Sequence, residues 1–191
     1  DIEGFKELVK GSFAITPNVP EAEYLSSMKI SNEKDQELAA RTIKEIYSVE
    51  SVIVKGGHLS GTDVGVFGKK VVKVRGELYR IKNTHGTGSV FASLFAGLIA
   101  KGLSPEEAFE RASMLTRLSV LYSLDVGEGI GPVNPLAYLQ LDSEKFRVVQ
   151  DMYVLGHAIK RMNNFVKLIP EVQMNVAHSV SPEFVTSLNE I

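Results

Sequence analysis

The 191-residue chain contains no cysteine. This absence excludes disulfide bonds, thiolate metal sites and a cysteine nucleophile from the chain. The sequence also lacks any block of five or more like charges, and its 21 basic and 23 acidic residues leave a net charge of −2. Because nothing in that balance favours nucleic acid or an anionic membrane surface, we expect neither partner.

Long hydrophobic runs are missing as well. The longest, residues 90–100, is about half of the ~20 apolar residues that span a bilayer, and we interpret it as a buried helix. The sequence opens on Asp1 and shows no basic segment followed by an apolar one, so we expect no signal peptide and a truncated N-terminus. The absence of cysteine is compatible with the cytoplasmic location that we expect.

The composition that remains is that of an ordinary globular chain, with 44% hydrophobic and 23% charged residues. Short apolar runs alternate with helical patterns, and this order predicts an α/β fold with a partly parallel sheet. Strands are expected at residues 13–16 and 51–55, with two or three antiparallel strands in residues 63–81. Helices are expected at residues 32–48 and 104–123, and an apolar helix is expected after residues 83–89 and as far as Lys101.

Two helices are expected to present an apolar face to a core. In residues 32–48 the inward face comprises Leu38, Ala39, Ile43, Ile46 and Tyr47. In residues 143–162 it comprises Phe146, Val149, Met152, Tyr153, Leu155, Gly156 and Ile159. The intervening residues 125–135 are rich in glycine and proline, as linkers are. We therefore divide the chain into residues 1–134 and 135–191.

The segment His85-Gly86-Thr87-Gly88-Ser89 stands directly before an apolar helix. Its glycines let backbone amides converge, and the helix dipole adds about half a positive charge at this end. The pattern therefore indicates an anion site, with phosphate as the natural ligand. The same glycines would also suit a tight turn between a strand and a helix, and the loop alone leaves both interpretations open.

Two further segments precede this loop, "ITPNVPEAE" at residues 15–23 and "VIVKGGHL" at residues 52–59. With "RIKNTHGTGS" and the capped "LSPEEAFERA", they resemble the hydroxymethylpyrimidine and hydroxymethylpyrimidine-phosphate kinases of thiamine biosynthesis, in the ribokinase-like superfamily. The resemblance covers roughly residues 5–135. It implies a three-layer α/β/α sandwich, incomplete at its N-terminal side because the family's opening strand and pyrimidine-binding loop have no counterpart here.

The resemblance also implies ATP and Mg²⁺ as cofactors and a small pyrimidine as substrate. It matches Asn18 and Glu21 to an element that helps to hold magnesium, which prefers oxygen ligands. Lys55 matches the lysine that approaches the nucleotide phosphates. Gly57 and His58 follow it, and His58 lies either near the nucleotide or in a closed loop.

In the glycine loop, the resemblance assigns Gly86, Thr87 and Gly88 to the anion hole that faces the transferring phosphoryl group. His85 is expected beside the nucleotide, where its side chain orders the turn. Ser89 departs from the family, which usually reads H-G-T-G-C-T here. A serine hydroxyl is no base at pH 7, so catalysis would rest on positioning and electrostatics, and we expect this chain alone to be weakly active.

The C-terminal text "GIGPVNP" followed by "LIPEVQMNVAHS" resembles the junction between such a kinase and an archaeal-type thiamine-phosphate synthase domain. Glu171, Asn175 and His178 fall within it, either as ligands or as parts of a capped turn. Two other functions stay open for the whole chain. One is a different ribokinase-like kinase, such as a pyridoxal kinase. The other is a non-catalytic module that senses a nucleotide or a thiamine intermediate, or that builds the homo-oligomer we expect.

Overall fold

The computed structural model describes residues 2–57, 59, 61–76, 81–162, 164–169 and 175–184. It divides into two compact units, Asp1–Val133 and Asn134–Ile191. The first unit holds the sheet, and the second is built around one long helix. None of the helices in these described ranges combines the length and apolar composition needed to cross a membrane.

The sheet of the first unit is mixed, with the strand order β1-β2-β3-β4. Its strands are β1 (Ala14–Ile15), β2 (Ser51–Val54), β3 (Asp63–Phe67) and β4 (Lys70–Val74). β1 runs parallel to β2, whereas β2, β3 and β4 pair in antiparallel fashion. The predicted strands are therefore confirmed as far as residue 74, and the part of the prediction on residues 77–80 lies outside the described residues.

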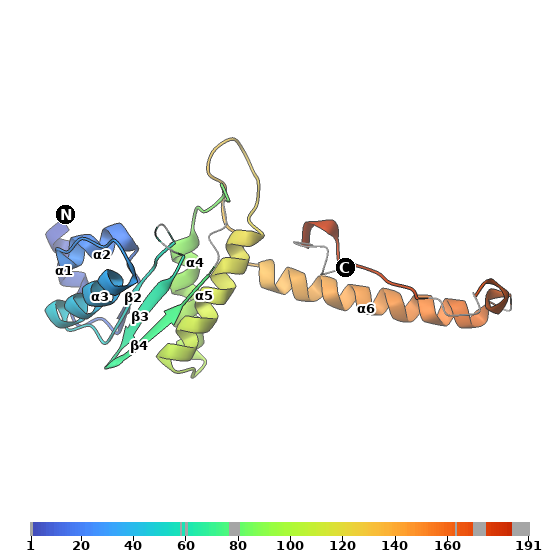
Figure 1. Ribbon diagram of the computed structural model, residues 1–191, viewed down its shortest axis with the longest axis horizontal. Coiled ribbons are helices and arrows are strands. Elements are labelled where there is room, and N and C mark those ends of the chain that lie inside the picture. Colours follow the sequence, from blue (N-terminus) through green and yellow to red (C-terminus); the bar gives the residue numbers. More distant parts are fainter. Residues whose placement is uncertain are drawn as a thin grey trace. The chain divides into compact units, whose positions relative to one another are not determined.

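Helices lie on both sides of this sheet (Figure 1). One side carries α1 (Ile2–Val9), α2 (Val19–Ser26) and α3 (Glu33–Tyr47). The other side carries α4 (Thr87–Ala100) and α5 (Pro105–Leu121). α3 and α5 begin where the sequence predicts, since Asn32 and Ser104 cap their first turns with their side chains.

Strand β2 separates two hydrophobic cores. Val52 and Val54 pack with the α2 and α3 side, whereas Ile53 packs with α4 and α5. Successive side chains of a strand point to opposite faces, and a strand covered on both faces is apolar throughout. On the α4 and α5 side, Phe91 and Phe109 are buried against each other edge to face, with ring centroids 6.4 Å apart.

The inward face of α3 differs in part from the prediction. Ala39, Ile43 and Tyr47 are buried as expected, but Leu38 and Ile46 are 52% and 57% exposed. Each of the two stands one residue, or about 100° of helix rotation, before a residue of the buried stripe. The prediction was therefore wrong for these two positions, because the stripe is narrower than the apolar pattern of the sequence.

Helix α4 is also less buried than its apolar sequence suggests. Phe91 and Phe95 are the buried residues of this helix, and they join the core shared with α5. Small residues, Ala92, Ala96 and Gly97, occupy exposed positions of the same helix. Our interpretation of residues 90–100 as a buried helix therefore holds for one face, because α4 is an outer layer.

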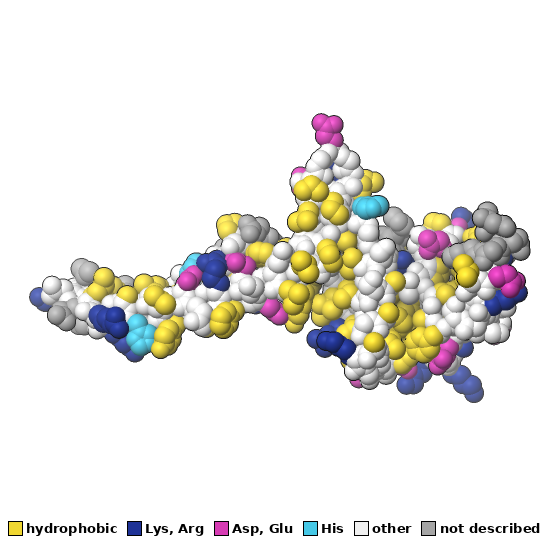
Figure 2. Space-filling model, turned by 180° about the vertical axis from the view of Figure 1, so that it is seen from behind, with side chains coloured by type: hydrophobic (Ala, Val, Ile, Leu, Met, Phe, Trp, Pro, Cys, Tyr) yellow, Lys and Arg dark blue, Asp and Glu magenta, His cyan; other side chains and the backbone are white. Residues whose placement is uncertain are grey.

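The second unit contains α6 (Ala137–Arg161) and two short 3-10 helices, Phe165–Leu168 and Pro182–Phe184. The inward face predicted for this helix is wrong: Phe146, Val149 and Tyr153 are 62–66% exposed. Apolar side chains are visible at intervals along its surface (Figure 2). The polar contacts of residues 175–184 with α6 include hydrogen bonds to Glu144 and Arg147 and a pair between His178 and Asp151, which lie on its charged face.

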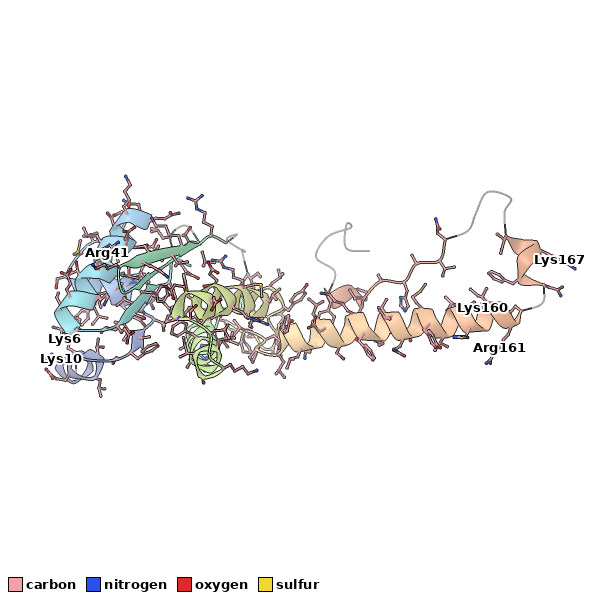
Figure 3. All side chains as sticks on the ribbon, turned by 90° about the horizontal axis from the view of Figure 1, so that it is seen from below. Lys6, Lys10, Arg41, Lys160, Arg161 and Lys167 are labelled. Atoms are coloured by element: carbon pink, nitrogen blue, oxygen red, sulfur yellow. The ribbon has the colours of Figure 1, made fainter. Side chains whose placement is uncertain are left out.

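On that charged face, Glu144 joins α6 to the C-terminal segment. Its carboxylate accepts hydrogen bonds from Arg147 and from the Ser181 hydroxyl, at 2.8 and 2.7 Å. These bonds lower the pKa of Glu144 to about 2. At the other end of α6, Lys160 and Arg161 occupy the last turn (Figure 3), where positive charge is favourable to the helix dipole.

The register of α3 can be tested by two substitutions in the same helix. Ile43→Ala should lower the free energy of unfolding by about 2 to 5 kcal/mol, because it opens a cavity in a closed core. Leu38→Ala, which removes an exposed side chain of the same size, should change it by less than about 0.5 kcal/mol. Chemical denaturation measures both, and equal losses for the two variants would contradict the register.

Candidate functional site

The carboxyl ends of β1 and β2 meet at one edge of the sheet. Asn18 and Lys55 form an isolated parallel bridge there, and the Lys55 amide donates to the Pro17 carbonyl at 2.9 Å. The antiparallel strand β3 begins at this same edge with Asp63. Three segments that are far apart in the sequence thus place polar side chains together.

The N-terminus of α4 lies at this edge as well. Gly86, its N-cap residue, has a φ of 87°, in the left-handed region that glycine adopts without strain. No side chain caps the helix, while the Thr87 hydroxyl donates to the Thr84 carbonyl at 2.7 Å. Within the described part of the chain, the first-turn amides of Gly88 and Ser89 have no side-chain partner, and such amides at a helix N-terminus favour an anion.

The turn before α4 is ordered by backbone hydrogen bonds. The His85 amide donates to the Gly131 carbonyl at 3.1 Å, and the Val133 amide donates to the His85 carbonyl at 3.0 Å. Behind it, the buried Asn83 side chain accepts from the Gly131 amide at 2.8 Å. We expected the His85 side chain to order this turn, but the backbone does so and His85 is exposed.

Lys55 joins the strand edge to the helix. A Cβ atom placed on Gly88 would lie 3.1 Å from the Lys55 ammonium nitrogen, so this charge lies directly beside the first turn of α4. Burial lowers the pKa of Lys55, and the nearby carboxylates of Glu21 and Asp63 oppose that shift. An ammonium and a helix N-terminus thus face the same space, which favours a polyanionic ligand.

Asn18 and Glu21 form a capping box at the start of α2. The Glu21 amide donates to the Asn18 side chain at 2.9 Å, and the Asn18 amide donates to Glu21 Oε2 at 2.7 Å. The described residues contain no cluster of three or more histidine, cysteine or acidic side chains that could hold a metal alone. One carboxylate and one amide oxygen nevertheless suit Mg²⁺, which keeps several waters and is commonly shared with substrate phosphates.

Asp63 is largely buried at this edge, and the sequence left open whether it forms hydrogen bonds at the strand entry or, by the resemblance, lies toward the nucleotide. Its carboxylate accepts from the Gly56 amide at 3.0 Å and from the Ser113 hydroxyl at 3.2 Å, and Arg117 Nη2 lies 3.6 Å away. Burial raises the pKa of Asp63, against the effect of these partners. A signal was present in α5, since Phe109, Ser113 and Arg117 recur every four residues and so share its inward side.

The remaining predicted residues are placed as follows. Gly57 is exposed in the turn after Lys55, and Ser89 is exposed on the first turn of α4. His58 lies outside the described residues. The structure thus brings together Asn18, Glu21, Lys55 and Gly88, while the roles assigned to all of these residues stay predictions.

Comparison with solved structures identifies the class of fold. Pyridoxal kinase from Staphylococcus aureus in complex with AMP-PCP superposes with a TM-score of 0.67 at 27% sequence identity, over 71% of this chain and 52% of that one. The domain is therefore similar to ribokinase-like kinases. A family model described as phosphomethylpyrimidine kinase matches residues 2–134, and the chain belongs to that family.

Two curated relatives are informative. The hydroxymethylpyrimidine/phosphomethylpyrimidine kinase of Bacillus subtilis is 39% identical over 135 residues, which are 69% of this chain and 49% of the relative. A thiamine biosynthesis bifunctional protein of Geobacter sulfurreducens is 38% identical over 126 residues, or 64% of this chain and 26% of the relative. The chain spans about half the length of the Bacillus kinase.

The contact between Lys55 and α4 can be tested with Gly88→Ala. The added methyl group would lie against the flexible end of Lys55 and should displace the ammonium while leaving the melting temperature unchanged or higher. Sulfate binding, followed by NMR shifts of the amides in the first turn of α4, should weaken severalfold. In the control Gly97→Ala, the methyl group meets open space on the same helix, and sulfate binding should be unchanged. Equal sulfate affinity in the two variants would contradict the assignment.

Proposed function

We propose that this chain carries the ATP-binding part of a hydroxymethylpyrimidine/phosphomethylpyrimidine kinase. The reaction would transfer the γ-phosphoryl group of ATP to hydroxymethylpyrimidine or to its monophosphate. The observation that carries this proposal is the Lys55 ammonium beside the uncapped N-terminus of α4. Membership of the phosphomethylpyrimidine kinase family supports the choice of substrate.

In phosphoryl transfer, charge spreads over the three equatorial oxygens of the transferring group, and catalysis is mainly positioning and electrostatic stabilisation. The amides of Gly88 and Ser89 and the ammonium of Lys55 would supply that stabilisation, since all three are donors that face one space. Asn18 and Glu21 would hold Mg²⁺, which neutralises phosphate charge when it is bound. The exposed Ser89 hydroxyl would take no proton as a base, so the rate would depend on those donors.

An apolar groove of about 330 Å³ offers a place for the base of the nucleotide. It is lined by Val74, Arg75, Met114, Arg117, Leu118 and Leu121. Pockets of roughly 300–1,000 Å³ with apolar walls are usual for small ligands. Arg117 belongs both to this groove and to the ion pair with Asp63, so the groove adjoins the proposed phosphate site.

The rest of the substrate site is proposed to come from sequence beyond this chain, which spans 49% of its Bacillus relative. The fold would then be a three-layer α/β/α sandwich that is incomplete on the N-terminal side of β1. We also propose that residues 135–191 begin a thiamine-phosphate synthase-like domain. The end of the family match at residue 134 and the bifunctional relative support this division.

A pyridoxal kinase is the second candidate, because a pyridoxal kinase superposes with a TM-score of 0.67. Its sequence identity of 27% is below the 39% found with the pyrimidine kinase of Bacillus subtilis. We therefore favour the pyrimidine substrate. Parallel assays with hydroxymethylpyrimidine and with pyridoxal as phosphoryl acceptors distinguish the two.

The role of Lys55 can be tested by Lys55→Met, which keeps the length of the side chain and removes its charge. A charge-assisted hydrogen bond contributes about 1.5 to 3 kcal/mol, so the Kd for Mg²⁺·ATP should rise roughly 10-fold to 150-fold. Calorimetric titration measures the Kd. Lys101→Met, at the opposite end of α4, should leave it unchanged, and an unchanged Kd in both variants would exclude the proposed phosphate site.

Activity should depend on the substrate contacts that we propose to come from sequence beyond this chain. Orientation of bound reactants contributes up to about 7 to 11 kcal/mol, so we expect the 191-residue chain alone to be nearly inactive in a phosphoryl-transfer assay. A chimera that joins it to the uncovered part of the Bacillus relative should be active, and Ser89→Cys in that chimera should raise its rate, since a thiol ionises nearer neutral pH.

Robust turnover by the isolated chain would refute the proposal that it carries only the ATP-binding part of the active site. An inactive chimera, with serine or cysteine at position 89, would instead favour the non-catalytic sensing module.

A further inference from the structure

The backbone around Lys55 is held on both sides. Its own amide donates to the Pro17 carbonyl at 2.9 Å, and the following amide, of Gly56, donates to Asp63 Oδ1 at 3.0 Å. Gly56 is buried, and a Cβ atom there would lie 1.9 Å from the Thr62 carbonyl oxygen. The backbone is therefore closely packed and hydrogen-bonded directly after Lys55, at the end of β2.

The segment after Gly56 closes on itself. The amides of Leu59 and Gly61 both donate to the Gly56 carbonyl, at 2.9 and 3.1 Å. The far end of the segment is tied to α3, because the buried Gln36 side chain donates to the Thr62 carbonyl at 3.1 Å. The Gly56 carbonyl, one residue after Lys55, is thus bonded to the Leu59 and Gly61 amides.

Arg117 holds this turn from α5. Its guanidinium donates to the carbonyls of Gly61 and Val74 at 3.0 and 2.9 Å and also to the carbonyl of Arg75. The Nη2 nitrogen that donates to Gly61 and Val74 also lies 3.6 Å from Asp63 Oδ2. A single arginine therefore joins α5, the end of β4 and the turn that follows Lys55.

Asp63 itself is poorly placed to react with a substrate. Its side chain is 14% exposed, and its oxygens are engaged by the Gly56 amide, the Ser113 hydroxyl and Arg117. A carboxylate surrounded by donors in this way fixes the groups around it. Lysine has a flexible four-carbon stem, so an ammonium that must meet a phosphate benefits from a fixed backbone.

We propose that Asp63, oriented by Arg117 and Ser113, is the positioning residue that holds the Lys55–Gly56 peptide and thereby directs the Lys55 ammonium to the N-terminus of α4. This inference rests on the proposed function, because it treats Lys55 as the phosphate-binding lysine. Asp63 acts through the backbone and touches no nucleotide.

A double-mutant cycle on the full 191-residue chain tests this role, with AMP-PCP and Mg²⁺ as the probe and calorimetric Kd as the readout. Asp63→Ala should weaken binding about 10-fold, through loss of the bond to Gly56. Asp63→Asn keeps an oxygen for the Gly56 amide and should stay within about threefold of wild type. In the Lys55→Met background, Asp63→Ala should change the Kd by less than about twofold, because the ammonium that Asp63 positions is absent from that variant.

Asp35→Ala is the matched control. It also removes a carboxylate that accepts a backbone amide bond, from Ser31 at 2.9 Å, but at the start of α3, and it should leave the Kd unchanged in both backgrounds. If Asp63→Ala fails to fold, Ser113→Ala removes one donor to the same carboxylate. It should then weaken binding only when Lys55 is present.

The outcomes separate the two claims. Equal losses from Asp63→Ala, or from Ser113→Ala, with and without Lys55 would overturn the positioning role while leaving the nucleotide site intact. A wild-type chain that does not bind AMP-PCP, or a Lys55→Met variant that binds it normally, would overturn the proposed function and the positioning role with it. Selective loss with Lys55 present, and recovery in Asp63→Asn, supports the inference.

Discussion

The contact between the Lys55 ammonium and the first turn of α4 joins the carboxyl end of β2 to a helix whose core Ile53 of the same strand shares. Lys55 follows β2, which packs against α3 on one face, whereas α4 packs with α5 on the other side of the sheet. The backbone bonds to Pro17 and Asp63 fix one partner of this contact. Gly88 leaves room for the lysine, since a Cβ atom there would lie 3.1 Å from the Lys55 ammonium nitrogen.

The electrostatics of the site favour an anion. Burial lowers the pKa of Lys55, and the carboxylates of Glu21 and Asp63 offset part of that effect. The uncapped amides of α4 add positive potential without adding a titratable group. A polyphosphate would satisfy both the ammonium and these amides, and Mg²⁺ at Asn18 and Glu21 would moderate the repulsion between the phosphate and the carboxylates.

Sequence reasoning succeeded where the determinants are local. The side-chain cap at Ser104 and the apolar run of β2 depend only on residues that are neighbours in the sequence, and the structure confirms both. Prediction from the sequence failed where burial of a residue is determined by tertiary contacts. The sequence pattern of α3 could not show that Leu38 lies outside the buried stripe, and that of α6 could not show that Phe146 is exposed.

The candidate site shows the same division. The loop around Gly88 was predicted as an anion site from its glycines, Lys55 was assigned through the family resemblance, and the structure brings the two together. Asp63 and Arg117 form an ion pair although they lie 54 positions apart in the sequence, and Arg117 also binds the carbonyls of Gly61 and Val74. No local sequence pattern reveals these contacts. The spacing of Phe109, Ser113 and Arg117 in α5 indicates burial on one side of the helix rather than a role in the site.

The most direct test of this account is a crystal structure of the chain with AMP-PCP and Mg²⁺. We predict terminal phosphate oxygens within hydrogen-bond distance of the Gly88 and Ser89 amides and of the Lys55 ammonium. A second basic surface is available for comparison, a groove of about 440 Å³ whose lining includes Arg41, Lys44 and Lys69. Phosphates bound in that groove, with the first turn of α4 left without an anion, would contradict the central claim.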